Sequence, residues 1–449
     1  IDPQEQGKKW LSNMEAKNKV CTSRLTDKNM LRDLENCIRI GRPLLIEDIG
    51  EVLDPALEPV LQRAVFKQGG RLLIRLGDSD VDYDPTFRFY LTTKLPNPHY
   101  LPEVCIKVTV INFTVTMTGL VDQLLGDVVG KERPDVEERM GKLVISIAAD
   151  KKQMLEIENK ILKSLSESEG NILDDVDLIR TLDDSKVVSA MISQRLEESV
   201  TTKAEIDEIR SSYKSVSVRA SLIYFVVADL ALVDPMYQFS LAYFKRLFHI
   251  CIDESEKSDV LQERLTAIIE YATEYIYVNV CRGLFEAHKL IYSFLVCGAI
   301  LRECGDVSDI EWKLLLRGAG LVENPIPNPN PEKIKSLGWN LLHVLSESIP
   351  DKFGGISEEF TEDGEDRMEW FEWFQGSEPH KTPLPSDFWN NRLNSMQKML
   401  LVKAMREEKG AAAVADFVME KMGRIYVEAP PVRLEDVYKD SSNRTAVVF

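Results

Sequence analysis

The stretch from Glu137 to Tyr213 decides the architecture of this 449-residue chain. It opens with EERMGKLVISIAADKKQMLEIENKILKSL (137–165) and returns, after a polar turn, with VVSAMISQRLEESVTTKAEIDEIRSSY (187–213). In both arms apolar residues recur at steps of three, four and seven, with a weaker stretch at 199–203. This spacing predicts the seam of a long antiparallel coiled-coil hairpin with charged outer faces. The seam residues are Leu143, Ile147, Met154, Ile157, Ile161 and Leu165 on the first arm, and Val188, Ile192, Leu196, Ile206, Ile209 and Tyr213 on the second.

The turn between the arms is predicted at Ser166–Asn171, where Gly170 and Asn171 both tolerate positive φ. Each arm of about 28 residues spans about 40 Å at the helical rise. Two interpretations fit this length. The hairpin is either buried against the body of the protein or serves as a strut that supports a partner outside it, and the length favours the strut.

Composition restricts the class of protein. The hydrophobic content of 44% and the charged content of 29% are ordinary for a soluble globular chain of two to four domains. The net charge of −18 argues against direct binding to nucleic acid or to an anionic membrane. The apolar runs at 222–233 and 290–301 are too short to span a bilayer, so no membrane segment is predicted.

The cysteines and histidines predict neither a disulfide framework nor a metal site. The seven cysteines are scattered without a C-x-x-C pair, which is typical of a reducing compartment. The five histidines show no spacing that suits a metal. The start at Ile1 lacks the features of a signal peptide, and both ends of the sequence read as if cut inside a strand.

Residues 1–135 alternate between helical and extended patterns. An amphipathic helix is predicted at Leu31–Ile38, and short apolar segments predict strands at Arg42–Asp48, Ala64–Phe66, Arg71–Ile74, Phe87–Thr93 and Val108–Val115. Apolar strands separated by helices imply a mostly parallel sheet with helices on both faces. Ligands of such sheets bind beyond the carboxyl ends of the strands.

Residues at those strand ends match the parts of a nucleotide site: Gly7 and Lys8 in a loop, Glu47 and Asp48 after one strand, and Thr93 after another. A hydrolysing site needs a phosphate-cradling loop ending in Lys-Ser/Thr and an acid that holds Mg²⁺ and orients water. Lys9 stands where that hydroxyl belongs, and acids in the loop would repel phosphate. The sequence therefore predicts a degenerate nucleotide site without catalytic or metal-binding residues.

The remaining chain reads as helical. Residues 215–305 carry broad apolar faces, with helices predicted at 220–232, 236–251, 260–277 and 280–301. A proline-rich connector, Asn324–Pro331, follows, and helices and acidic loops then lead to the end of the chain. The predicted domains are an α/β domain (1–135), the hairpin (136–214), a helical small domain (215–305), and a linker with the incomplete start of another domain (306–449).

Several motifs together resemble the fifth AAA+ module of dynein heavy chains, most closely those of the axonemal, inner-arm type. They are IDPQ (1–4), GRPLLIEDIGE (41–51) with LDP (53–55), FKQGG (66–70), FRFYLTTKLPNPHY (87–100), ERP (132–134), EGNIL (169–173) and DPMYQ (234–238). The resemblance covers the whole chain. It implies an α/β plus α fold: a P-loop-type AAA+ sheet domain, the coiled-coil hairpin known as the buttress, a helical small domain, and the start of the sixth module.

The resemblance implies a mechanical role. In the family, the buttress leans on the stalk coiled coil that carries the microtubule-binding domain, and the fifth and sixth modules do not hydrolyse nucleotide. The implied partners are the stalk and neighbouring AAA+ modules of the same heavy chain, with dynein intermediate and light chains and, through the parent, the microtubule. ATP, ADP and Mg²⁺ belong to other modules of the parent, so no cofactor is expected here. The implied location is the cytoplasm and the cytoskeleton of the ciliary or flagellar axoneme.

One further residue follows from the resemblance. AAA+ modules offer an arginine to the neighbouring module's nucleotide near the start of the last large-domain strand, and Lys107 holds that place here. It could supply charge without the bidentate fork of arginine, or it could be a surface lysine.

Two other functions remain open. The first is an independent nucleotide-binding ATPase that uses Lys8, Glu47, Asp48 and Thr93. The second is a helical adaptor that docks partners on residues 216–305.

Overall fold

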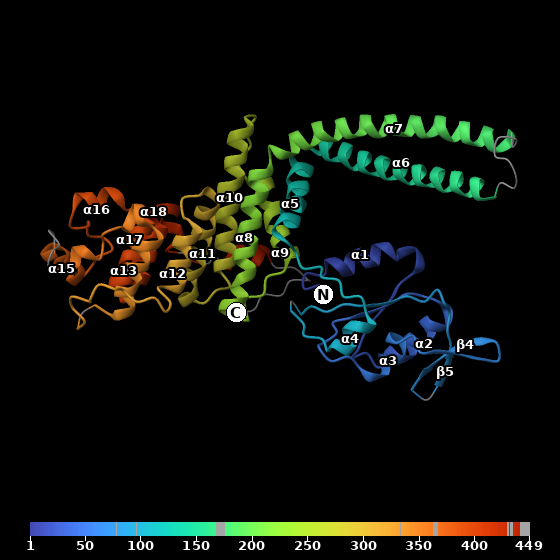
Figure 1. Cartoon of the computed structure of the whole chain (residues 1–449), viewed down its shortest axis with the longest axis horizontal. Coiled ribbons are helices and arrows are strands. Elements are labelled where there is room, and N and C mark those ends of the chain that lie inside the picture. Colours follow the sequence, from blue (N-terminus) through green and yellow to red (C-terminus); the bar gives the residue numbers. More distant parts are fainter. Residues whose placement is uncertain are drawn as a thin grey trace. The chain divides into compact units, whose positions relative to one another are not determined.

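The computed structural model describes residues 1–77, 79–95, 97–167, 176–332, 334–361, 367–428, 431 and 434–440. The chain divides into two compact units, Ile1–Leu120 and Val121–Phe449 (Figure 1). Most of the described residues are helical, and the strands belong to the first unit.

The first unit contains two small sheets. The parallel sheet has the strand order β1-β2-β6, and an antiparallel sheet has the order β3-β4-β5. The register of the parallel sheet places Arg24 opposite Glu47 and Leu44 opposite Phe89. The elements of this unit are α1 (Gln6–Met14), β1 (Cys21–Arg24), α2 (Met30–Ile40), β2 (Leu44–Glu47), α3 (Glu58–Leu61), β3 (Val65–Gln68), β4 (Arg71–Leu76), β5 (Ser79–Asp82), β6 (Phe89–Leu91) and α4 (Pro102–Lys107).

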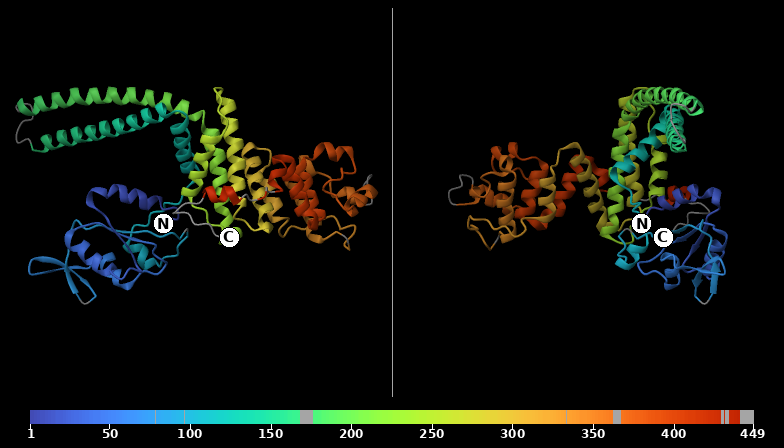
Figure 2. Two further views of the ribbon diagram at one scale, coloured as in Figure 1. Left: turned by 180° about the vertical axis from the view of Figure 1, so that it is seen from behind. Right: turned by 45° about the vertical axis from the view of Figure 1, so that its right-hand side comes forward.

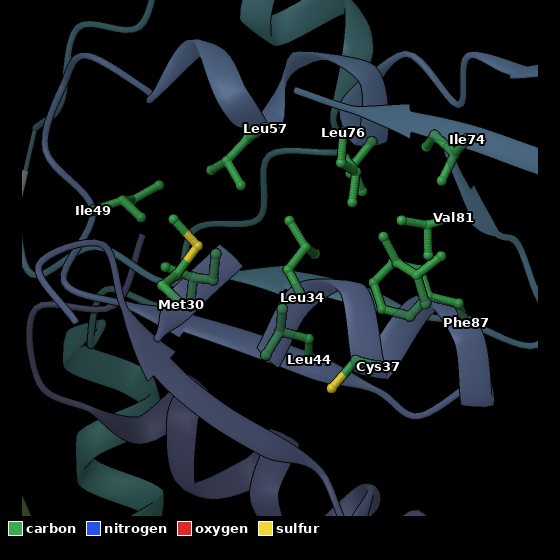
Figure 3. Packing of buried hydrophobic residues seen from close by; sticks show 13 residues of the cluster. Met30, Leu34, Cys37, Leu44, Ile49, Leu57, Ile74, Leu76, Val81 and Phe87 are labelled. Carbon is green, nitrogen blue, oxygen red and sulfur yellow. The ribbon is translucent and has the colours of Figure 1, made fainter. Parts of the chain in front are cut away.

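The core of this unit lies between α2 and the two sheets. Helix α2 buries one face, and every residue of β2 is buried, as expected for the central strand of a parallel sheet. Figure 3 shows side chains from α2, β2 and the β4–β5 hairpin pointing toward one another. The buried set includes Met30, Leu34, Cys37, Leu44, Ile49, Leu57, Ile74, Leu76, Val81 and Phe87.

The strand predicted at Val108–Val115 is wrong, because the described residues there form no regular strand. The segment bonds to Ile1: the Ile1 amine donates to the Ile111 carbonyl at 2.8 Å, and the Phe113 N–H donates to the Ile1 carbonyl at 2.8 Å. On its other side the Asp2 N–H donates to the Thr93 carbonyl at 2.8 Å. Ile1 and Asp2 thus link residues 111–113 to Thr93, which follows the end of β6.

The second unit begins within α5 (Met117–Glu132) and continues into two long helices, α6 (Pro134–Glu167) and α7 (Val176–Ser211). Its bundle consists of α8 (Lys214–Val233), α9 (Leu241–Glu254), α10 (Leu261–Cys281) and α11 (Glu286–Cys304). Further helices follow: α12 (Asp309–Arg317), α13 (Ser336–Ser348), α14 (Pro350–Phe353), α15 (Arg367–Gln375), α16 (Asp387–Arg392), α17 (Ser395–Met405), α18 (Gly410–Met422) and α19 (Leu434–Asp440).

The domain boundary predicted at residue 135 therefore lies too late. Helix α5 joins the helical unit because its charged side chains pair with α9 and α10. Lys245 of α9 lies 2.7 Å from Asp127, and Arg264 of α10 lies 2.7 Å from Glu132. The described residues of the predicted next domain, 306–449, form helices, and the strand expected near Val447 lies outside the described residues.

Helices α6 and α7 run side by side in both views of Figure 2. Their contacts run in opposite directions along the chain: Glu137 with Arg210, Asp150 with Arg195, and Met154 with Ser189. The pair is an antiparallel helical hairpin. Most of its predicted turn, residues 168–171, lies outside the described residues.

The helix α8 is long and apolar enough to cross a bilayer by length and composition. Its buried residues, among them Ile223, Tyr224, Val227 and Leu230, instead pack in the bundle. The pKa of Asp229 is raised because partial desolvation by its surroundings disfavours the charged form. These contacts are those of a core helix in a bundle.

The proline-rich connector at 324–331 is held against the helices that follow it. The Asn324 side-chain amide donates to the Trp339 carbonyl at 3.1 Å, and the Trp339 indole donates to the Ile326 carbonyl at 2.8 Å. The connector is thus anchored at the start of α13 rather than running free as a linker.

Candidate functional site

The predicted nucleotide site lies where β2 ends and α1 begins, within the first unit. The structure brings Lys8 and Glu47 together, with the Lys8 ammonium 2.8 Å from Glu47 Oε1. The angle is outside hydrogen-bond geometry, so the contact is a Coulombic pair. Thr93 is buried, and its hydroxyl accepts from the Leu95 N–H at 3.2 Å.

Two further cations that the sequence analysis missed complete this cluster. Arg24 lies 3.8 Å from Glu47 and 3.6 Å from Asp48. Lys94 lies 2.9 Å from Glu5 and 3.5 Å from Asp48, and its hydrogen bond holds the pKa of Glu5 below its usual range. Positive and negative groups of the site therefore neutralise one another.

In the loop before α1, the carboxylate of Asp2 bonds to the backbone at the start of α1. Asp2 is 3% exposed, and its Oδ2 accepts from the Lys8 backbone N–H at 2.8 Å. Gly7 is buried beside it, and a Cβ there would lie 3.1 Å from the Phe113 ring and 3.3 Å from Asp2 Oδ2. The loop is packed tightly around a carboxylate.

These residues do not fit a magnesium nucleotide. The Lys8 ammonium is paired with Glu47, and the side chain of Lys9, which follows it, has no hydroxyl with which to ligate Mg²⁺. Among the described residues, no group of three or more His, Cys, Asp or Glu side chains is arranged to hold a metal ion. The charge pairs engage Lys8 with Glu47, and Asp48 with Arg24 and Lys94.

A cavity of about 590 Å³ lies next to this loop, between β6 and residues 104–113. Its lining is mainly apolar and aromatic, including Trp10, Phe89, Tyr100 and Phe113. Such a lining suits apolar groups better than a triphosphate.

Lys107 is the last residue of α4 and does not begin a strand as predicted. The reason is that the chain forms a helical turn at Pro102–Lys107, with proline at its first position. The Lys107 ammonium pairs with Glu58, whose pKa it lowers through a hydrogen bond. This pairing holds the charge within the unit.

The predicted seam residues of the hairpin lie mostly at its interior. Ile206 is 2% exposed, and Met154, Ile157, Ile161 and Leu196 are half-buried. Ile209, in contrast, is 38% exposed and does not lie in the seam. The heptad repeat steps by four residues from Ile206, so Arg210 takes the interior position and lies 3.6 Å from Glu137.

A buried acid also interrupts the seam. Asp150 is 5% exposed at the place between Ile147 and Met154 where the repeat would carry an apolar residue. Arg195 of α7 donates to its Oδ1 at 2.6 Å. A polar pair at one interior position fixes the register in which two helices pack.

The root of the hairpin is a second site that the sequence analysis missed. Helix α5 ends at Glu132, and Arg133 separates it from α6, which begins at Pro134. Arg264 of α10 is 3% exposed and grips the Glu132 carboxylate with two hydrogen bonds of 3.0 and 2.7 Å. The same guanidinium donates to the backbone carbonyls of Ile252, Ser255 and Glu256. One buried arginine therefore joins the start of the hairpin to the α9–α10 turn.

The outer faces of the hairpin carry exposed apolar side chains between their charges. On α6 these include Ile145 (71% exposed) and Leu162 (64%), and on α7 Val187 (61%) and Val200 (63%). Single exposed apolar residues are common, but several along one pair of helices suit contact with another helix.

Known relatives match this chain from end to end. It is 47% identical to dynein axonemal heavy chain 6 of Homo sapiens, 42% identical to dynein axonemal heavy chain 1 of Homo sapiens and 42% identical to dynein axonemal heavy chain 3 of Mus musculus. A family model described as the ATP-binding dynein motor region matches residues 1–192. The chain belongs to the dynein heavy chain family. Each alignment includes all of this chain but only 10 to 11% of the relative, so the chain spans about a tenth of the length of these relatives.

The match confirms the resemblance to axonemal dynein heavy chains and the AAA-type motor region, and the assignment to the fifth module stays a prediction. The family model covers the sheet unit and continues into the hairpin helices.

Proposed function

We propose that this chain is a non-hydrolysing relay in an ATP-driven, minus-end-directed microtubule motor. In this proposal the hairpin of α6 and α7 is the coiled-coil buttress of the fifth AAA+ module. It passes rearrangements of the motor ring to the stalk coiled coil during ciliary or flagellar movement. The partners are the stalk and the neighbouring AAA+ modules of the same heavy chain. Intermediate and light chains join the complex, and the parent binds the microtubule in the axonemal cytoskeleton.

The observation that carries this proposal is the build of the hairpin. Its two helices, of 34 and 36 residues, pack against each other along an apolar seam and are joined by the Asp150–Arg195 pair. Its root is tied to the bundle through Glu132 and Arg264. A stiff arm with a fixed register and a fixed base is suited to transmitting displacement.

The self-neutralised loop supports the absence of hydrolysis. Lys8 contacts Glu47, and Asp2 takes the Lys8 N–H, so the groups that would bind phosphate are engaged. The alternative, an independent ATPase, predicts tight Mg-ATP binding and turnover that is lost in Lys8→Ala. Calorimetric titration of the 449-residue chain with ATP and ADP, with and without Mg²⁺, separates the two. Turnover by the wild-type chain would overturn the relay proposal.

The adaptor alternative has less support. Exposed apolar residues of the bundle, such as Leu232 (87% exposed) and Phe285 (53%), are separated in sequence and lie on different segments.

The relay role is tested in the heavy chain with Ile157→Asp in the seam. The added charge loosens the hairpin, so ATP should no longer shift microtubule affinity while basal ATPase is retained. Ser146→Asp places the same charge on the exposed face of the same helix and serves as the matched control. Normal coupling in the Ile157→Asp motor would contradict the proposal.

A further inference from the structure

The side chain of Asp2 stands at the point where a phosphate would bind. In the loop Asp2-Pro3-Gln4-Glu5-Gln6-Gly7-Lys8, Asp2 occupies the first glycine position of the phosphate-loop pattern. It is 3% exposed, and its Oδ2 accepts from the Lys8 backbone N–H at 2.8 Å. Its Oδ1 is buried and has no hydrogen-bond partner among the described residues.

The backbone around Asp2 fixes this orientation. The Asp2 N–H donates to the Thr93 carbonyl at 2.8 Å, and the Asp2 carbonyl accepts from the Glu5 N–H at 3.3 Å. Glycine at position 7 leaves the room that the carboxylate occupies, since a Cβ there would come within 3.3 Å of Oδ2. The carboxylate is therefore held at the first turn of α1, a helix of nine residues.

A phosphate at a helix N-terminus is held by backbone N–H groups, the helix dipole and, in this motif, a lysine ammonium. Here two internal carboxylates take these partners. Asp2 receives the backbone N–H of Lys8, and Glu47 lies 2.8 Å from its ammonium. The donors of an anion site are therefore in place, and the carboxylates of Asp2 and Glu47 occupy them.

We propose that Asp2 is a built-in phosphate mimic that closes a latent anion site at the N-terminus of α1. When this carboxylate is removed, the site takes a phosphate group, either as an inorganic anion or as part of a nucleotide. The inference deepens the proposed function, on which it rests, because it names what keeps the module silent.

The test compares the wild-type 449-residue chain with Asp2→Gly by isothermal titration with inorganic pyrophosphate and, separately, with ADP. Asp2→Gly should bind pyrophosphate at least about tenfold more tightly than the wild type, because a backbone N–H and the helix dipole become available. Equal affinity for pyrophosphate and ADP points to an anion site alone, whereas tighter binding of ADP points to a nucleotide site. Both outcomes support a latent phosphate site.

Glu5→Gly is the matched control. This substitution removes one negative charge from the same loop but keeps the hydrogen bond from the Lys8 N–H to Asp2. Glycine suits position 5 because Glu5 has a positive φ of 55°. If Glu5→Gly gains as much affinity as Asp2→Gly, the effect is general electrostatics and the mimic is overturned. The same holds if the wild type already binds as tightly as Asp2→Gly.

A folding defect is covered by a second variant. Asp2→Asn keeps an oxygen that accepts the Lys8 N–H, so it should stay folded and bind pyrophosphate no more than about threefold better than the wild type. Its Lys8 amide should exchange with solvent as slowly as in the wild type. Fast exchange at Lys8 in the wild type would overturn the proposal. None of these results depends on ATP turnover, which tests the relay function separately.

Discussion

Replacing Arg264 with alanine should detach the root of the hairpin from the bundle. The guanidinium is 3% exposed, and its two bonds to Glu132 and its bonds to the Ile252, Ser255 and Glu256 carbonyls would all be lost. The Glu132 carboxylate would remain, largely buried, without its main partner. Breaking a buried ion pair in this way costs about 3–5 kcal/mol.

Local hydrogen exchange is the suitable assay, because a chain of two compact units does not have one free energy of unfolding. Amides of the α9–α10 turn and the end of α5 should exchange at least about a hundredfold faster in Arg264→Ala, since every 1.4 kcal/mol corresponds to a factor of ten. Arg264→Lys keeps the positive charge but not the two-pronged hydrogen bonding of arginine, so its exchange rates should lie between those of the wild type and Arg264→Ala.

Lys257→Ala provides the control. This lysine contacts the same carboxylate at 3.5 Å, but its side chain is 63% exposed, so its loss should change local stability by less than about 1 kcal/mol. Exchange in Arg264→Ala within about threefold of the wild type would refute the assignment of the root to this pair.

Three other perturbations have defined outcomes. The Arg264 hydrogen bond lowers the pKa of Glu132 from 4.5, so the Glu132–Arg264 pair stabilises the fold above pH 4.5 and loses this effect as the pH falls through the lower folded-state pKa. Hydrogen exchange of α5 amides should therefore become faster in acid in the wild type but not in Glu132→Gln. Gly338→Ala should speed hydrogen exchange in α13 and α17, because its Cβ would overlap the backbone carbonyl of Ala404 in α17. Gly141→Ala, with nothing within 4 Å of the added Cβ, should instead raise helix stability by about 1 kcal/mol. Arg195→Ala should cost the hairpin about 1–2 kcal/mol by leaving Asp150 buried and unpaired, and adding Asp150→Leu should recover the loss; no recovery in calorimetric melts would show that the pair contributes more than its charge balance.

The hairpin could be predicted from the sequence because its apolar repeat persists over many turns. The errors arose where charged residues take interior positions. A search for apolar residues does not detect Asp150 or the aliphatic part of Arg210 at interior positions. The apolar pattern therefore assigns Ile209 to the seam, although Arg210 occupies that position. Long side chains can lie along an apolar seam while their charges find partners, and only the packed helices reveal this.

The sequence predicts that Lys8 and Glu47 lie close together, as they do, but it does not predict their other charged neighbours. The spacing of Gly7 and Lys8 after the first residues locates the loop, whereas Arg24 reaches Glu47 only because β1 pairs with β2 in a particular register. Strand β1 itself, Cys21–Arg24, is short and mostly polar and gives no apolar signal. The link between Glu132 and Arg264 joins residues 132 positions apart, for which no local pattern exists.

The short break at Arg133 has a geometrical consequence for whatever meets the far end of the hairpin. The 34 residues of α6 extend about 50 Å from this break at the helical rise. A rotation of only about 6° at the root therefore carries the far end of α6 through about 5 Å, the height of one helical turn. A rotation that hardly displaces residues near the root therefore moves the far end of the hairpin by about one helical turn along a neighbouring helix.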